Sequence, residues 1–238
     1  MARKKIKKKD LKKPDEFISF GQKIINWCVA NKQSAIKLAA GVLIIFLVVS
    51  GFLYYRNQRE ARAREVYTQA VAYLQNARQA NGGKGDIDRA IAKLEETVKN
   101  FGSTGVALTA TVDLGNAYYQ KGDFAKAVAA YKDALQKIAR QDPLYENVLA
   151  SLGATYEAME EWSEALAVYQ RLLQEGKPAY QTDAELCLGR VYEAMGNRNK
   201  AMGYYETYLN ENPGSSLSPV LKTKLEQWRL EGISPEKG

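Results

Sequence analysis

Histidine is absent from this chain of 238 residues. Because histidine is the most frequent general base, its absence excludes Ser-His and Cys-His nucleophile pairs and every metal site that needs an imidazole ligand. Only two cysteines occur, Cys28 and Cys187, which are too few for a disulfide framework or a four-thiolate metal site. We therefore expect a protein without enzymatic activity, bound metal or cofactor.

The remaining composition is that of a folded protein. Hydrophobic residues make up 46% of the chain and charged residues 26%, so extensive disorder is excluded. The length suits one medium-sized domain with accessory segments, or two small domains.

The positive charge is concentrated at the N-terminus. Residues 1–37 contain 11 Lys or Arg against 3 Asp or Glu, whereas residues 56–238 contain 23 against 24. The basic tail could set membrane topology while solvated, contact anionic lipids of the inner leaflet, or bind nucleic acid. It lacks interleaved aromatic residues and precedes a hydrophobic segment, so we expect no nucleic-acid partner.

An uncharged apolar segment follows the tail. Eighteen residues between Lys37 and Arg56, LAAGVLIIFLVVSGFLYY, would rise about 27 Å as a helix, close to the roughly 30 Å of a bilayer core. A buried core helix or a cleaved signal peptide are the alternatives, but no A-x-A-like cleavage site follows. We predict a cytosolic tail over residues 1–34 and an uncleaved transmembrane signal anchor over residues 35–56. The span contains no GxxxG motif, so nothing indicates that it dimerises.

The predicted orientation of the span depends on the number of Lys and Arg residues in the whole N-terminal tail. Three Lys or Arg precede the span within about 20 residues and four follow it, which gives no preference, whereas the complete tail places the N-terminus in the cytosol. The C-terminal part is then expected outside the cytosol.

The segment before the span has the pattern of an amphipathic helix on the membrane surface or against a partner. Pro14 suits a first helical position, and Asp15 and Glu16 suit a first turn. The apolar stripe comprises Phe17, Phe20, Ile24, Trp27 and Cys28.

Three segments beginning at Leu114, Leu152 and Leu188 align without internal gaps. Each has Leu-Gly, then Tyr three residues after the Gly, Ala twelve after it and Tyr sixteen after it. These positions are Gly115, Tyr118, Ala127 and Tyr131, then Gly153, Tyr156, Ala165 and Tyr169, then Gly189, Tyr192, Ala201 and Tyr205.

This spacing predicts pairs of helices. Leu, Gly and the first Tyr share one stripe of a first helix, and Ala and the second Tyr share a stripe of a second helix. Turns are expected at Lys121-Gly122-Asp123, Glu160-Glu161 and Gly196-Asn197. The small Gly and Ala would let the paired helices approach, while the aromatic rings would fill the groove to the neighbouring unit.

Residues 57–105 have the pattern of a degenerate first repeat. Val66, Tyr67, Ala70, Val71 and Leu74 lie at helical spacing. After a glycine-containing loop over residues 81–85, a second helix has Asp86 as its expected N-cap and Ile87, Ala90, Ile91, Leu94 and Val98 on one face. The loop lacks a preceding strand and a Gly-Lys-Ser/Thr sequence, so an ordinary loop is favoured over a phosphate site.

Residues 215–238 are expected to cap the array. Ser218-Pro219 would open a helix whose Leu221, Leu225 and Trp228 face inward, and Gly232 would end it. A stack of repeats needs such a cap because its last unit would otherwise expose an apolar face.

The three segments resemble the tetratricopeptide repeat (TPR). Phe124 and Trp162 match its aromatic turn position and Pro213 its terminal proline. The departures are registers of 38 and 36 residues instead of 34, Arg198 at the turn position of the third unit, and no opening Trp. We predict an all-α protein in which one N-terminal transmembrane helix precedes a TPR-type solenoid of helical hairpins, with the three repeats over residues 106–214.

The resemblance implies a concave protein-binding groove lined by the first helices. The matching positions are Thr109, Val112, Asn116 and Tyr119, then Asn147, Ala150, Ala154 and Glu157, then Asp183, Leu186, Arg190 and Glu193. Tyr119 and Arg190 are the expected anchors, with a purely solvated or packing role as the alternative for each position. The carboxylate-clamp type of TPR domain is matched only at Asn116, which disfavours that ligand class.

Two other features are interpreted as structural. The Glu160-Glu161 pair suits a solvated turn better than an acid/base site. Cys187 falls on an inner helix face, where it would act as a small apolar residue, and it could not pair with Cys28 across a membrane.

The order of basic tail, one span and repeats resembles the bacterial ancillary SecYEG translocon subunit (YfgM-like) family. That resemblance implies a scaffold of the bacterial inner membrane whose periplasmic domain binds translocon, chaperone or envelope proteins, with membrane lipid around the span and no small-molecule substrate. The alternatives are an assembly factor for envelope or cell-division machinery, a regulatory subunit of a membrane enzyme, and, if the topology is inverted, a cytosolic docking receptor.

Overall fold

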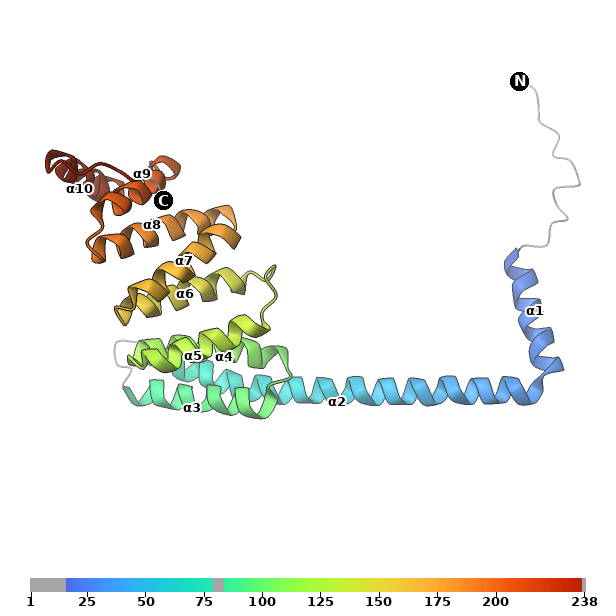
Figure 1. The fold of residues 1–238 in the computed structure, drawn as a ribbon. Helices are drawn as coiled ribbons and strands as arrows, with labels where there is room; N and C mark the ends of the chain where they lie inside the picture. The colour runs from blue at the N-terminus through green and yellow to red at the C-terminus, as the bar shows by residue number, and fades with distance from the viewer. Residues whose placement is uncertain (1–15, 79–83, 237–238) are drawn as a thin grey trace, which may run out of the picture. The chain divides into compact units, whose positions relative to one another are not determined.

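The computed structural model describes residues 16–78 and 84–236, and these residues form helices and no strands (Figure 1). The chain divides into two compact units, one through Asn57 and one from Gln58. The helices are α1 (Glu16–Ala30), α2 (Lys32–Arg78), α3 (Lys84–Phe101), α4 (Gly105–Lys121), α5 (Phe124–Lys137), α6 (Leu144–Ala158), α7 (Trp162–Glu175), α8 (Pro178–Ala194), α9 (Arg198–Glu211) and α10 (Ser218–Leu230).

The first unit contains α1 and the apolar part of α2. Pro14 and Asp15, the expected start of α1, lie outside the described residues, and so do the side chains of Phe17 and Phe20. Ile24 and Trp27 of α1 are about half exposed. The helix α2 is long and apolar enough to cross a membrane, and none of its most apolar 18-residue window is buried.

The part of α2 from Gln58 onward forms a hairpin with α3. Ala63, Ala70 and Leu74 are buried, and the Arg59 guanidinium donates a 2.6 Å hydrogen bond to the Asn100 carbonyl of α3. The helix α3 begins at Lys84, so the prediction of Asp86 as its N-cap is wrong. Asp86 lies in the first turn instead, where its carboxylate faces the positive end of the helix dipole.

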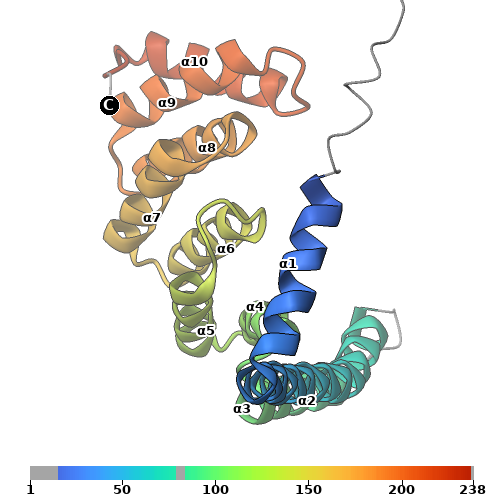
Figure 2. The same ribbon diagram turned by 90° about the vertical axis from the view of Figure 1, so that its right-hand side faces the viewer.

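Three further hairpins follow the first one in a stack, α4/α5, α6/α7 and α8/α9, in which each helix packs on the next (Figures 1 and 2). The expected turns are present. Gly122 and Gly196 adopt left-handed φ values of 85° and 79°, which glycine permits without strain. Glu160 takes the same role between α6 and α7, with φ at 59°.

The repeat glycines and the second tyrosines fit each other within one hairpin. A Cβ on Gly153 would lie 2.5 Å from the Tyr169 ring, and Gly115 and Gly189 face Tyr131 and Tyr205 in the same way. These tyrosines therefore fill a notch in their own hairpin. They also reach the neighbouring unit, as expected, since the Tyr205 ring centroid lies 6.2 Å from that of Trp228 in α10 and Tyr131 lines a cavity together with Ser151 and Ala154 of α6. The notch exists only because the first helix has no side chain at that point.

The first tyrosine of each repeat packs differently. The Tyr118 hydroxyl donates a hydrogen bond to Glu95 of the preceding helix α3, and the ammonium of Lys132 in α5 lies 5.5 Å from the Tyr156 ring centroid. These two rings therefore join neighbouring units as expected. Tyr192 instead stacks on Tyr204 of its own hairpin, with centroids 5.6 Å apart.

The first hairpin, α2/α3, packs in a similar way, but a small aliphatic side chain replaces the tyrosine of the repeats. The Arg89 guanidinium lies 5.9 Å from the Tyr73 ring, as Lys126 lies 5.2 Å from Tyr118 in the next hairpin. This correspondence places Ala70 where the repeats have Gly and Leu94 where they have the second Tyr, and both are fully buried. A smaller aliphatic side chain on α3 thus leaves room for the Ala70 methyl group.

The helix α10 covers the end of the stack as predicted. Leu221, Leu225 and Trp228 are buried against α9, and Gly232 ends the helix with φ at 83°. The following residues turn back over α9, where the Glu236 amide donates a 3.0 Å hydrogen bond to the Asn199 carbonyl.

A carboxyl group is buried in α8. Glu185 is 9% exposed, and its Oε2 atom has no hydrogen-bond partner among the described residues. Burial, together with the charge of Glu211, raises the Glu185 pKa from 4.5 to about 7. Glu211 itself accepts a 2.7 Å hydrogen bond from the Thr182 hydroxyl.

We expect Gly153→Leu to lower the free energy of unfolding by about 1–3 kcal/mol or more, because the new side chain would collide with the Tyr169 ring. Urea unfolding of the full chain in detergent, followed by circular dichroism, measures this change. Gly85→Ala in the first turn of α3 is the matched control, since nothing lies within 4 Å of its Cβ position. An unfolding curve of Gly153→Leu that matches wild type would contradict the notch.

We expect Glu185→Gln to stabilise the protein at pH 8 by about 1–2 kcal/mol after allowance for solvent screening, and to have little effect below pH 4.5. A carboxyl whose pKa is raised in the folded state favours folding when protonated, and that advantage is lost as the pH rises from 4.5 through about 7. Urea unfolding at pH 4, 6 and 8 tests this, with the exposed Glu226→Gln as control. A difference independent of pH would refute the assignment.

Candidate functional site

The first helices of the hairpins lie next to one another along one face of the second unit. Contacts join α4 to α6 and α6 to α8, two helices apart in the chain. We call this surface the inner face. It carries most of the positions at which the sequence predicts a protein-binding groove.

Side chains at corresponding positions of neighbouring first helices can be grouped in pairs across the inner face. We call each pair a rung, made of the residue four positions after the repeat Gly and the residue one position after the next repeat Gly. With Ala70 counted as the first repeat position, and with Lys224 of α10 completing the last pair, the rungs are Leu74/Asn116, Tyr119/Ala154, Glu157/Arg190 and Glu193/Lys224.

The third rung is an ion pair. The Nε and Nη2 atoms of Arg190 each donate a 2.7 Å hydrogen bond to the Glu157 carboxylate, and the Tyr169 hydroxyl donates another of 2.5 Å. The hydrogen bonds to Glu157 raise the pKa of Arg190, and burial raises the pKa of Tyr169. Both groups therefore keep their protons at neutral pH, and the guanidinium of Arg190, an expected anchor, is already occupied.

The fourth rung repeats this arrangement. The Lys224 ammonium donates hydrogen bonds of 2.7 and 2.9 Å to the two carboxylate oxygens of Glu193, which also accepts one of 2.7 Å from the Tyr205 hydroxyl. The same ammonium lies 5.8 Å from the ring centroids of Tyr205 and Trp228. The fourth rung is thus closed by a residue of the capping helix.

The first two rungs contain no charged side chain. The Asn116 Oδ1 atom accepts a 2.7 Å hydrogen bond from the Tyr131 hydroxyl, whose pKa burial raises to about 12. Tyr119 is 40% exposed, and its ring centroid lies 5.4 Å from that of Phe124. Nothing in the described residues bridges Tyr119 to Ala154.

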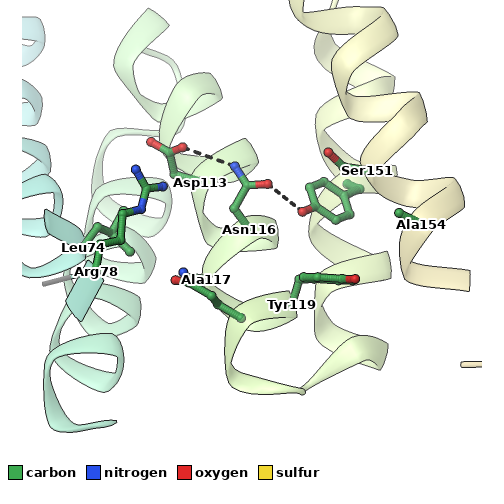
Figure 3. Close-up of a pocket in the computed structure, with 10 residues that line it drawn as sticks. Leu74, Arg78, Asp113, Asn116, Ala117, Tyr119, Ser151 and Ala154 are labelled. Carbon is green, nitrogen blue, oxygen red and sulfur yellow. Dashed lines mark hydrogen bonds between the residues drawn. The ribbon is translucent and has the colours of Figure 1, made fainter. Parts of the chain in front are cut away.

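A cavity of about 380 Å³ opens at these two rungs (Figure 3). Asn116, Tyr119 and Ala154, all predicted groove residues, line it together with residues that the repeat pattern did not indicate. Those additional residues are Leu74, Arg78, Asp113, Ala117, Gln120, Tyr131 and Ser151. The carboxylate of Asp113 accepts a 2.6 Å hydrogen bond from the Tyr67 hydroxyl of α2.

The other predicted groove residues lie in varied surroundings. Val112 is only 9% exposed and belongs to the core, so the structure does not place it at the surface. Thr109 and Ala150 are half-buried, Leu186 packs against the core under the capping helix, and Asp183 is exposed. Asn147 is exposed and accepts a 3.1 Å hydrogen bond from the Tyr180 hydroxyl.

The two cysteines are free thiols, and Cys187 is half-buried. Burial raises the pKa of the Cys187 thiol, so it stays protonated beside Arg190. Within residues 16–78 and 84–236, no group of three or more Cys, Asp or Glu side chains could hold a metal ion.

Comparison with solved structures shows the same fold at low sequence identity. A tetratricopeptide repeat protein from Parabacteroides merdae has 20% identity and a TM-score of 0.58, over 71% of this chain and 60% of that one. A crystal structure of MamA gives 23% identity and a TM-score of 0.51, over 63% and 81%. Pseudomonas aeruginosa pilF gives 21% identity and a TM-score of 0.52, over 73% and 72%.

No curated protein sequence matches the chain. A protein-family comparison, in contrast, matches residues 26–229 to the family described as "Tetratricopeptide repeat-like domain". That range includes the apolar part of α2, all four hairpins and most of α10. The chain therefore belongs to the tetratricopeptide repeat-like domain family.

Proposed function

We propose that this protein is a membrane-anchored scaffold of the bacterial inner membrane that binds other polypeptides through the inner face of its repeats. The single observation that carries the proposal is that one chain has both an exposed apolar helix segment and an open cavity on its TPR surface. The proposed partners are translocon components, periplasmic chaperones or envelope proteins, as the resemblance to the YfgM-like family implies.

The anchoring rests on the exposure of the apolar segment. Ile44, Phe46 and Val48 are each more than 60% exposed, and the neighbouring apolar side chains are similarly uncovered. Water would meet a far larger continuous apolar surface here than soluble monomers expose. Insertion in lipid removes that cost, and Lys37 and Arg56 at the two ends would reach the headgroups.

Anchoring in the membrane would also allow weak binding at the inner face to be sufficient. A tether holds the repeat domain close to other membrane proteins, so its effective concentration beside them is far above its average concentration in the cell. A cavity of about 380 Å³ with few charged groups then suffices for selective contact. The excess of Lys and Arg over the whole N-terminal tail supports a cytosolic tail and periplasmic repeats.

We expect protease added to intact spheroplasts to digest the repeats and to leave the N-terminal tail protected. Antibodies against the two ends distinguish the fragments, and lysed spheroplasts serve as the control. Digestion of the tail with protected repeats would invert the topology and contradict the periplasmic site.

We expect a photoreactive amino acid at position 119 to crosslink the full chain to protein partners in living cells, whereas the same group at Leu230 should not. Leu230 is 86% exposed on α10 and thus controls for exposure alone. Mass spectrometry identifies the adducts. Translocon or chaperone adducts would support the proposed partners, and cell-division or enzyme adducts would favour the alternative functions.

A further inference from the structure

The four rungs of the inner face differ in chemistry along the stack. Leu74/Asn116 and Tyr119/Ala154 are uncharged, whereas Glu157/Arg190 and Glu193/Lys224 are ion pairs. The cavity lies at the first two rungs and at neither of the last two. The Gly–Tyr contact recurs in all three repeats, so we attribute the difference in where the inner face is open to the side chains of the rungs.

The closed rungs resist opening because each cation completes a hydrogen-bond network. The Glu157 side chain is only 14% exposed and accepts from both Arg190 and Tyr169. A partner that displaced Arg190 would leave a largely buried carboxylate without its counter-charge, which is costly. The same holds for Glu193, which is held by Lys224 and Tyr205.

The second rung, like the third, lies beside a hydrogen-bonded tyrosine. Among the described residues, however, no hydrogen bond or ion pair joins Tyr119 to Ala154. Tyr131 is already satisfied by Asn116, as Tyr169 is by Glu157. The Ala154 methyl group stands where Arg190 stands one repeat later, and the cavity lined by Ala154 and the exposed Tyr119 ring opens there (Figure 3). A side chain supplied by another molecule can occupy it.

The walls of the cavity favour an uncharged apolar occupant. Asp113 and Arg78 bring one charge of each sign, so their effects on a charged side chain largely cancel and do not offset the hydration that it would lose. Leu74, Ala154 and the ring of Tyr119 offer apolar surface to a neutral side chain. The Gln120 amide and the Ser151 hydroxyl can bond the peptide groups on either side, whereas the Asn116 amide already bonds Tyr131 and Asp113.

We propose that the partner is an extended polypeptide segment that inserts one uncharged apolar side chain between Tyr119 and Ala154, and that the half of the inner face with ion-paired rungs does not bind it. This inference rests on the proposed function, because it assigns the chemistry and the place of the partner within the same inner face.

The first test closes the open rung. Tyr119→Glu combined with Ala154→Arg recreates the Glu157/Arg190 pair one repeat earlier. The full chain in nanodiscs is titrated with fluorescein-labelled reduced carboxymethylated α-lactalbumin, a permanently unfolded polypeptide, and fluorescence anisotropy reports binding. We expect the affinity to fall about tenfold, the value of one buried apolar side chain, while the thermal unfolding midpoint is retained.

Glu157→Gln combined with Arg190→Gln is the matched control, because it removes the charges of a closed rung and keeps side chains that can hydrogen-bond. We expect its affinity for the same probe to equal that of wild type. Wild-type affinity of the Tyr119→Glu, Ala154→Arg variant, or a tenfold loss in the control, would overturn the inference.

The second test reads the anchor chemistry. A cellulose-bound array of 13-residue Gly/Ser peptides carries Leu, Phe, Lys, Arg or Glu at its centre and is probed with the full chain in detergent. We expect Leu and Phe peptides to retain about tenfold more protein than the charged ones. Preference for a charged centre would overturn the inference.

Photoreactive residues at positions 119 and 157 distinguish a failure of this inference from a failure of the proposed scaffold function. Crosslinks to the labelled probe from position 119 alone support both. Crosslinks that are equally strong from position 157 sink the inference and leave the scaffold function standing, whereas no crosslinks from either position contradict the scaffold function itself.

Discussion

The fit of a tyrosine ring against a glycine is the contact on which the rest of this solenoid depends. In each of the three repeats the ring lies where a Cβ on the opposing helix would be only 2.5–2.6 Å away. The contact fixes the distance between the two helices and also the place of the tyrosine hydroxyl. That hydroxyl reaches the inner face and bonds Asn116, Glu157 or Glu193. The packing of a hairpin and the chemistry of its binding surface are therefore set by one pair of residues.

The inner face has one half with uncharged rungs and one half with ion-paired rungs, and both are built from the same kind of helical hairpin. Glu157 and Glu193 lie four positions after a repeat Gly. Each binds a cation from another helix, Arg190 of α8 or Lys224 of α10, and the surface is closed there. Where Leu74 or Tyr119 holds that position, no ion pair forms and a cavity remains. Repeats of this kind can change what they bind without changing how they fold, because the Gly–Tyr contact that sets the hairpin lies at other positions than the rungs.

The sequence was sufficient to predict the helical hairpins, their turns and the capping helix, because Gly, Ala and Tyr at fixed spacing have one packing solution. It was not sufficient to show that the second tyrosine of each repeat also fills a notch in its own hairpin, because the sequence pattern indicated only the groove to the neighbouring unit. The start of α3 was also missed by three residues, because acidic residues suit both the N-cap and the first turn. Within the site, repeat matching indicated Asn116, Tyr119 and Ala154 but not Asp113 or Ser151. Those two precede the repeat Gly by two positions, and only the stacking of α4 on α6 brings them to the cavity. Aligning Tyr73 with Tyr118 would have indicated Leu74.

The helix α2 has no break between its apolar segment and the residues that pack in the first hairpin. Anyone preparing a water-soluble fragment of the repeats must therefore cut inside a helix. A fragment that starts at Gln58 would expose four backbone N–H groups whose carbonyl acceptors have been removed. Two residues further on lies Glu60, whose carboxylate accepts a 3.2 Å hydrogen bond from the Gly105 amide, so fraying there would loosen the start of α4 as well. A Ser or Asp placed just before Gln58 would supply one of the four missing acceptors and so reduce fraying of the shortened helix.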